Sequence, residues 1–352
     1  MNSYVKEKKL LLKQYLDAEL DRQSAVFSGQ NRWPDDSFRK IKEFISRGKM
    51  VRGALAYLAY EAYGGKDRSL IDPVAGALEL LHAGFLIHDD VMDRDEMRRG
   101  APSMHVQYRK DLEGKQDCDV ERNSENIALC LGNICYFLAF DMLNKTNISP
   151  KRKTSLTALF NREAVTTGFG QMDDLYISGT ECFPDTQTIL NIYRMKTACY
   201  TFSLPLAAGA LTAGAAAKES QKLIQTGLEI GTLFQMRDDE LNLFGNEEIT
   251  GKPAGSDVRE GKKTLLYSLI LQNARNDERK FVLEMLGKKD VTPEDIARIV
   301  RIAESSKAAE KHKMMMNRSA QKASALIKKL KTGEGFGTVF ETILNFSYKR
   351  EN

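Results

Sequence analysis

One cluster of acidic side chains has the spacing of a metal site. In LLHAGFLIHDDVMDRDEMRRG, residues 80–100, Asp89 and Asp93 lie one turn apart on one helical face, with Asp90 beside them. His82, seven residues before Asp89, falls on nearly the same stripe. Like charges at this spacing repel one another in a helix and need a compensating cation. Carboxylate oxygens suit Mg²⁺, which usually shares its coordination with substrate phosphates. The segment therefore predicts a magnesium site beside a phosphate.

A second acidic cluster ends another apolar helical segment. FQMRDDELNLFG, residues 234–245, carries Asp238 and Asp239, with Gln235 one turn before Asp239 and Asn242 one turn after Asp238. Two such helix ends could face each other and hold ions between them. The negative partial charge of helix C-termini also favours cations there. For either cluster alone, a solvated helix end is the competing explanation.

Basic side chains flank both clusters. They are Lys49 and Arg52 before the first cluster, Arg98 and Arg99 after it, and Lys252, Lys262 and Lys263 after the second. Arginine forks fit phosphate oxygens, and the glycines around Lys252 let an anion approach closely. Lys49 and Arg52, three residues apart, are expected on one helical face. Each basic pair alone is explained by a solvated surface. A solvated surface does not easily explain why two acidic clusters and these basic residues occur together.

Two further polar pairs lie between the clusters. Gln171 and Asp174, three residues apart, share a helical face. Lys196 and Thr197 sit in an otherwise apolar and aromatic segment. A lysine in such a segment either extends its ammonium group to water or faces a charged ligand, and spacing alone leaves both open.

Helices must position all these residues. Long segments of helical apolar spacing and only eight prolines predict an all-α fold. Asp72-Pro73 and Thr292-Pro293 read as helix starts. We expect helices near 4–27, 36–46, 50–63, 72–93, 123–144, 151–178, 186–213, 217–243, 263–273, 276–286, 293–330 and 335–348. Loops are expected at 94–122, as a surface insertion, and at 244–262, the better functional candidate.

Length suggests two domains, but the continuous helices predict one domain over 1–352.

Composition excludes several classes of protein. The 352 residues are 42% hydrophobic and 28% charged, a globular balance. The net charge of +4 gives no support to a nucleic-acid partner. The charged N-terminus and the lack of a long apolar run predict neither a secretory signal nor stable membrane insertion. Five cysteines without CxxC spacing fit a reducing, cytoplasmic location.

Taken in order, these motifs resemble the trans-isoprenyl diphosphate synthase family, also called polyprenyl synthases. The resemblance runs from about Gly48 to Thr264 and continues more weakly to the C-terminus. The matching pieces are Gly48-Lys49, His82, Asp89-Asp90-Val91-Met92-Asp93 with Arg98-Arg99-Gly100, Gly170-Gln171, Lys196-Thr197, Phe234 to Asp239, and Gly251-Lys252. Asn242 departs from the family, which most often has aspartate there.

The resemblance implies a helical bundle around a deep cavity, usually a homodimer, that uses about three Mg²⁺ ions. Asp89, Asp93 and Asp238 would bind metal directly, and Asp90 and Asp239 would act through waters. The allylic diphosphate would be held by Arg98, Lys196, Lys252 and Lys262. Isopentenyl diphosphate would be held by Lys49, Arg52, His82 and Arg99, with Phe234 and Gln235 near its tail. Gln171 and Thr197 would face the developing carbocation.

The implied reaction is head-to-tail prenyl transfer. Neutralised diphosphate leaves, the allylic C–O bond ionises, and the double bond of isopentenyl diphosphate attacks the cation. Phe85 lies one turn, about 5.4 Å, before Asp89 and could form the floor beneath the growing chain. An aromatic residue at this position is similar to the pattern of short-chain synthases. We therefore expect geranylgeranyl diphosphate as the product, with farnesyl diphosphate as the second choice.

Two related alternatives remain. A class I terpene cyclase also ionises diphosphates with magnesium, but it would normally carry an Asn/Ser/Glu triad in place of Asp238-Asp239. A non-catalytic subunit of a heteromeric synthase would typically lack the aspartates that this chain keeps. The aspartate pair and the isopentenyl-site residues therefore favour the synthase.

Overall fold

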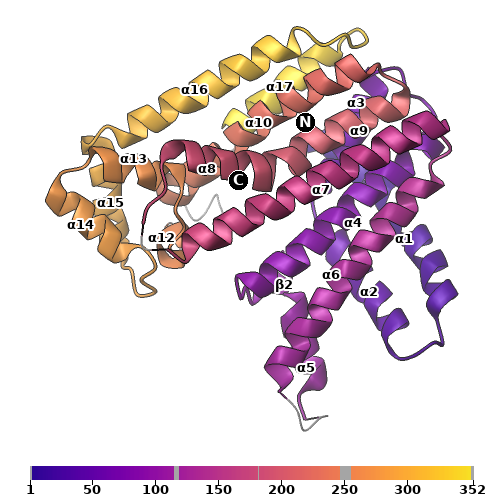
Figure 1. Ribbon diagram of the computed structural model, residues 1–352, viewed down its shortest axis with the longest axis horizontal. Helices are drawn as coiled ribbons and strands as arrows, with labels where there is room; N and C mark the ends of the chain where they lie inside the picture. The colour runs from indigo at the N-terminus through magenta and orange to yellow at the C-terminus, as the bar shows by residue number, and fades with distance from the viewer. Residues whose placement is uncertain (1, 115–118, 181, 246–254, 350–352) are drawn as a thin grey trace. The chain divides into compact units, whose positions relative to one another are not determined.

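The fold is almost entirely helical, as predicted (Figure 1). The computed structural model describes residues 2–114, 119–180, 182–245 and 255–349. Within these ranges the strands are limited to one hairpin of two-residue strands. The described chain forms two compact units. The amino-terminal unit comprises Asn2–Thr157 and Ala208–Gly214, and the carboxy-terminal unit comprises Ala158–Ala207 and the chain from Ala215 onward.

The amino-terminal unit is built around a central apolar helix, α4. Its elements are α1 (Asn2–Phe27), α2 (Trp33–Ser46), α3 (Val51–Ala62), α4 (Arg68–Met92), β1 (Met97–Arg98), β2 (Ala101–Pro102), α5 (Met104–Leu112), α6 (Val120–Lys145) and the start of α7 (Pro150–Ser178). α4 packs against α6 and α3, and most of its side chains are buried. Its end carries the first acidic cluster, so the core of this unit fixes that cluster in place.

The start of α4 differs from the prediction. Asp67 caps the helix by accepting a hydrogen bond from the Ser69 amide at 2.9 Å, so Pro73 lies inside the helix. Asp72 is not a cap, because its carboxylate accepts hydrogen bonds from the Tyr57 hydroxyl at 2.5 Å and from Arg68 at 2.9 Å. The Tyr57 bond ties this turn of α4 to α3, and the Arg68 bond lies within α4 itself.

Two described helices, α4 and α6, are long and apolar enough to cross a membrane by length and composition. In α4, 83% of the apolar window is buried inside the protein, and in α6, 44%. The burial of α4 is typical of a core helix.

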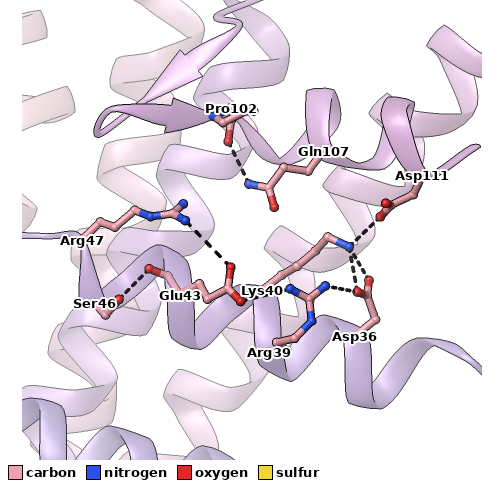
Figure 2. A network of polar contacts seen from close by, with 9 residues as sticks. All are labelled: Asp36, Arg39, Lys40, Glu43, Ser46, Arg47, Pro102, Gln107 and Asp111. Atoms are coloured by element: carbon pink, nitrogen blue, oxygen red, sulfur yellow. Dashed lines mark hydrogen bonds and ion pairs between the residues drawn. The ribbon is translucent and has the colours of Figure 1, made fainter. Parts of the chain in front are cut away.

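A polar network joins α2 to α5 (Figure 2). Lys40 is almost fully buried, and its Nζ donates to Asp36 and to Asp111, each at 2.7 Å. Gln107 on α5 donates to the Pro102 carbonyl at 2.8 Å, where the hairpin ends. The Gln107 bond ties the β1–β2 hairpin, which carries Arg98, to α5, and the Lys40 ion pairs tie α5 to α2.

The carboxy-terminal unit contains the rest of α7 and a layer of long helices. Its elements are α8 (Thr186–Ile192), the π-helix η1 (Tyr193–Ser203), the start of α9 (Leu204–Ala213), α10 (Ala217–Phe244), α12 (Ser256–Glu260), α13 (Leu265–Asn273), α14 (Asn276–Met285), α15 (Pro293–Ser305), α16 (Ala308–Ile327) and α17 (Phe336–Lys349). α10 packs against η1, α16 and α17, and α16 and α17 run beside it (Figure 1). α10 therefore organises this unit and carries the second acidic cluster at its end.

Four predicted segments differ from the structure. The helix expected over 293–330 breaks after Ser305, because Lys307 adopts a left-handed conformation with φ of 59°. The expected loop 94–122 contains the hairpin and α5, and the described part of 244–262 contains α12. The helix expected over 186–213 divides into α8, η1 and α9. The start predicted at Thr292-Pro293 is confirmed, with a capping box to Asp295.

The π-helix η1 needs glycines around it. A Cβ atom on Gly227 would lie 2.5 Å from the Ser203 backbone, and one on Gly231 would lie 2.5 Å from Ala198. A π-helix has a wider turn than an α-helix and often marks a functional site. The α10 glycines therefore let η1, which carries Lys196 and Thr197, pack closely against α10.

Candidate active site

The first acidic cluster divides into outer and inner carboxylates. Asp93 is the C-cap of α4 and is exposed, Asp89 is partly exposed, and Asp90 is fully buried. Arg98 donates from Nε to Oδ1 of Asp90 at 2.5 Å and from Nη2 to Asp95 at 2.7 Å. The predicted phosphate-binding Arg98 is therefore held by the inner carboxylate.

The donor set of this cluster fits a hard divalent cation. Burial raises the pKa of Asp90 to about 7, against the opposing effect of Arg98. The second oxygen of Asp90, Oδ2, is buried and has no hydrogen-bond partner among the described residues. Within the described ranges, no three His, Cys, Asp or Glu side chains form a complete metal site. Mg²⁺ usually completes its shell with water and substrate phosphates, so a cluster that offers only one or two carboxylates can still bind it.

A buried glutamate lies beneath the predicted isopentenyl-site cations, and the sequence reasoning missed it. Glu79 accepts a hydrogen bond from the Gly53 amide at 2.9 Å. Burial raises the pKa of Glu79, and the charges of Arg52 and Arg99 oppose that effect. Burial, then Arg52 and Arg99, lowers the pKa of His82 well below its usual value. The only sequence signal was an acidic residue one turn before His82 in an apolar helix.

Arg99 is fixed by the end of α2. Its Nη1 donates to the Phe44 carbonyl at 3.0 Å, and its guanidinium lies 5.1 Å from the centre of the Phe44 ring. A Cβ atom on Gly48 would lie 2.6 Å from Nη1, so a side chain there would displace the guanidinium group of Arg99. Burial is the largest effect on Arg99 and lowers its pKa. Gly48, noted as part of a motif, thus makes room for a cation.

Lys49 and Arg52 do not share a helical face, contrary to the prediction. α3 begins at Val51, and Met50 before it is left-handed with φ of 53°. Lys49 is therefore outside the helix and exposed, whereas Arg52 lies in its first turn. A non-glycine residue in this conformation gives no clear signal in a sequence.

The second acidic cluster shows the same division. Asp238 is exposed, and Asp239 is buried at 3% exposure. Asp239 accepts hydrogen bonds from the Tyr193 hydroxyl and from Gln235 Nε2, the latter at 3.3 Å. Burial, followed by the charges of Asp257 and Asp238, raises the pKa of Asp239 well above its usual value. One carboxylate faces water and its neighbour is anchored inside.

The π-helix brings the lysine–threonine pair next to α7 and α10. Lys196 Nζ donates to Asp174 on α7 at 2.6 Å, and Thr197 Oγ1 donates to Gln235 Oε1 at 3.2 Å. A Cβ atom on Gly170 would lie 2.5 Å from the Lys196 nitrogen, so glycine permits this approach. The ammonium group of Lys196 is thus held by a carboxylate and is partly exposed.

Asn242 has a structural role that an aspartate could not fill in the same way. Its Nδ2 donates to the Ser256 hydroxyl at 2.6 Å, and its Oδ1 accepts from the Asp257 amide at 3.0 Å. An aspartate could accept the second bond but could not donate the first. Asn242 therefore anchors the start of α12 to the end of α10.

The remaining predicted residues of the carboxy-terminal unit lie close to these elements. The Phe234 ring lies 5.4 Å from that of Phe202. Lys262 follows α12 and pairs with Glu260 at 2.6 Å. Gln171 lies partly exposed on α7, next to Gly170. Lys252 lies outside the described residues.

The predicted floor residue lies against an aromatic partner on the neighbouring helix. The Phe85 ring on α4 lies 5.3 Å from the Tyr136 ring on α6, and His88 lies 5.2 Å from the same ring. A Cβ atom on Gly84 would lie 2.4 Å from Tyr136, so glycine makes room for the tyrosine. The wall beneath Asp89 is therefore a pair of rings from two helices.

The candidate site is defined by clusters of charged side chains and not by the cavity described next. A cavity of about 450 Å³ beside Tyr108 lies between α2, α5 and α6, and its lining includes none of the predicted site residues. The amino-terminal unit instead gathers the first acidic cluster, Arg98, Arg99, Arg52 and His82 around α4. The carboxy-terminal unit gathers Lys196, Thr197, Gln235 and the second acidic cluster around η1 and α10. That the two sets face one cleft stays a prediction.

Comparison with known proteins defines the class. The fold matches a solved geranylgeranyl pyrophosphate synthase of Corynebacterium glutamicum, complexed with isoprenyl diphosphate and magnesium, with a TM-score of 0.89, 27% identity and coverage of 98% of this chain and 99% of that one. The sequence profile of the polyprenyl synthetase family matches residues 37–303. The chain belongs to this family.

Two curated relatives agree with this membership. The short chain isoprenyl diphosphate synthase of Methanocaldococcus jannaschii is 32% identical over 259 residues, covering 74% of this chain and 73% of the relative. The geranylgeranyl diphosphate synthase of Sulfolobus acidocaldarius is 32% identical over 255 residues, covering 72% of each.

Proposed function

We propose that the protein is a Mg²⁺-dependent prenyltransferase. It condenses isopentenyl diphosphate with an allylic diphosphate to give a short-chain trans-prenyl diphosphate, with geranylgeranyl diphosphate favoured. The observation that carries the proposal is that one apolar helix, α4, presents the outer carboxylates Asp89 and Asp93 at its end. Two to three turns earlier, the buried Glu79 and His82 of the same helix interact with the charges of Arg52 and Arg99. Relatives named for geranylgeranyl, geranylfarnesyl and farnesyl diphosphate synthesis support it.

The allylic diphosphate is the leaving group. Asp89, Asp93 and Asp238 would hold divalent ions which, when bound, neutralise the diphosphate charge. Arg98 and Lys196 pair with Asp90 and Asp174 and can exchange part of that pairing for phosphate oxygens. Lys252 and Lys262 are proposed to bind the same diphosphate. These groups stabilise charge that grows as the allylic C–O bond breaks.

Isopentenyl diphosphate is the nucleophile and needs its own cations. Arg52, Arg99, His82 and Lys49 are proposed to hold its diphosphate. Glu79 keeps the arginines in position from below, because it is buried and faces both charges. The lowered pKa of His82 keeps its imidazole neutral near pH 7, so it would act as a hydrogen-bonding group without a charge.

Bond formation follows from this arrangement. The double bond of isopentenyl diphosphate forms the new C–C bond with the allylic cation, and a proton then leaves, which we expect the departing diphosphate to accept. Gln171 and Thr197 are proposed to face the cation with their oxygen dipoles. Apolar walls around the tail exclude water, which would otherwise trap the cation.

The product length is proposed to depend on the two rings beneath the first cluster. Phe85 and Tyr136 are in contact, and a growing chain that reaches them must stop or displace them. Gly84 leaves no space for a side chain beside Tyr136. A rigid aromatic wall of this kind fits a short product, with geranylgeranyl ahead of farnesyl.

The protein is also proposed to form a homodimer. A stripe on α7 exposes four large apolar side chains, each about one turn from the next: Val165 at 57%, Phe169 at 55%, Met172 at 64% and Tyr176 at 75% exposure. On α6, Phe137 is 75% exposed. Monomers rarely expose contiguous apolar patches of this kind, and a second copy is the commonest partner.

Incubation with defined substrates tests the proposal. The protein is mixed with isopentenyl diphosphate, each allylic primer in turn and Mg²⁺ or EDTA, and the dephosphorylated products are separated by chromatography. We expect prenyl alcohols extended by five-carbon units, only with both substrates and metal. A hydrocarbon formed without isopentenyl diphosphate would indicate a terpene cyclase, and no product with any primer would indicate a non-catalytic subunit.

A further inference from the structure

Tyr193 joins three elements of the carboxy-terminal unit through one hydroxyl group. It is the first residue of η1, and its hydroxyl donates to Oδ2 of Asp239 on α10. The same oxygen accepts a hydrogen bond from the Leu265 amide, the first residue of α13, at 2.8 Å. Tyr193 is 7% exposed, so water competes little for these bonds.

The hydroxyl replaces a missing helix cap. The first amides of a helix have no partner within the helix and usually bond to the N-cap side chain. The N-cap of α13 is Thr264, and its side chain makes no cap bond; its Oγ1 is buried without a partner among the described residues. Tyr193, 72 residues earlier, supplies the acceptor instead.

A second contact runs parallel to the first. Thr197, one turn after Tyr193, donates to Gln235 at 3.2 Å, and Gln235 lies one turn before Asp239 and donates to it at 3.3 Å. Both oxygens of Asp239 are therefore engaged, and the carboxylate has one fixed orientation. The exposed Asp238 beside it takes its position from the same helical turn.

We propose that Tyr193 is a positioning residue that couples the second acidic cluster to the segment carrying Lys262. Its hydroxyl fixes Asp239 on one side and the start of α13, which follows Lys262, Lys263 and Thr264, on the other. The inference rests on the proposed function, because it assigns Tyr193 to the alignment of the metal-binding carboxylates with a diphosphate-binding lysine. The phenol itself touches neither substrate nor metal.

Tyr193→Phe tests the coupling, since it removes the hydroxyl and keeps the ring. We expect kcat to fall about tenfold or more and the Mg²⁺ concentration for half-maximal rate to rise several-fold. Amide hydrogen exchange at Leu265, measured without substrate or metal, should accelerate about tenfold or more because its acceptor is gone. This last readout is independent of activity.

Tyr57→Phe is the matched control. Tyr57 is also buried and also donates to a carboxylate, Asp72, at 2.5 Å, but it lies in the amino-terminal unit. We expect this variant to lose stability with unchanged kcat, Mg²⁺ dependence and Leu265 exchange. Equal kinetic losses in both variants would overturn the positioning role, as would a Tyr193→Phe enzyme with the kcat and Mg²⁺ dependence of the wild type.

A rescue variant separates capping from positioning. Thr264→Asn in the Tyr193→Phe background offers α13 a cap of its own without restoring the bond to Asp239. We expect the melting temperature to recover while kcat stays low. Recovery of both would show that Tyr193 only caps α13, and it would overturn the proposal. If the Tyr193→Phe variant does not fold, kcat and the Mg²⁺ dependence are measured on the double variant instead. Inactivity of the wild type would refute the proposed function, and Leu265 exchange would still report the Tyr193 bond.

Discussion

The rings of Phe85 on α4 and Tyr136 on α6 lie 5.3 Å apart and are tilted by 59° to each other. Phe85 precedes Asp89 by one turn, so this pair lies beneath the first acidic cluster. His88 packs edge-on against the same tyrosine. The length of the product should therefore depend on both rings and not on Phe85 alone.

Replacing Phe85 with alanine should lengthen the product. The smaller side chain opens space beneath the growing chain, and we expect the main product to gain at least one five-carbon unit; Tyr136→Ala should do the same. Chromatography of the dephosphorylated products measures the change, with Phe27→Ala on α1 as a control. If the Phe85→Ala enzyme makes no longer product, Phe85 is not the floor.

Replacing Glu79 with glutamine should weaken the isopentenyl diphosphate site. The amide keeps the bond to Gly53 but removes the carboxyl group that interacts with Arg52 and Arg99, so we expect KM for isopentenyl diphosphate to rise about tenfold, or about 1.4 kcal/mol. KM for the allylic primer should change much less. Steady-state kinetics test this against Glu61→Gln, which alters another carboxylate of this unit. An unchanged KM for isopentenyl diphosphate would show that Glu79 does not position the arginines.

Helix periodicity predicted the parts of the site that depend on local spacing. The segments that carry the two acidic clusters end within one residue of the expected positions, at Met92 and Phe244. Apolar stripes and the change to polar residues are local signals, and they place Asp89 and Asp238 at helix ends. The all-α class follows from the same periodicity.

Contacts between distant segments could not be predicted in this way. The bond from Tyr193 to Leu265 spans 72 residues, and the bond from Gly53 to Glu79 spans 26. The break between α15 and α16 carries no glycine or proline signal, because a lysine, Lys307, adopts the left-handed conformation there. α5 was missed although Met104, Tyr108 and Leu112 are spaced by one turn, because polar residues surround it.

His312 should make the protein less stable as the pH falls. The residue is buried on α16, and burial lowers its pKa to about 4, with a smaller opposing effect of Glu240. Between pH 6.5 and 4 the unfolded chain binds a proton that the folded chain does not, so stability decreases as the pH is lowered through this window, by up to about 1.4 kcal/mol per pH unit. An NMR titration of the four histidines should show an imidazole signal that stays neutral until about pH 4 and that is missing from the spectrum of His312→Gln. A signal from His312 that titrates near pH 6.5 would contradict this.

The exposed stripe on α7 should be required for self-association. Phe169→Glu places a charge in the middle of the stripe, and we expect the mass measured by light scattering to fall from that of a dimer to that of a monomer. Leu283→Glu, at another exposed apolar position, should leave the mass unchanged. A wild-type protein that is monomeric at micromolar concentration would contradict the proposed homodimer.

The most direct test of the account measures incorporation of labelled isopentenyl diphosphate by the wild type, Asp89→Ala and Asp238→Ala, with an allylic primer and Mg²⁺. Asp277→Ala, an exposed aspartate on α14, serves as the control. If carboxylates on both α4 and α10 hold the ions that release the diphosphate, each site variant should lose about a hundredfold to a thousandfold of the rate while circular dichroism shows the same helicity. Near wild-type turnover in either site variant would contradict it.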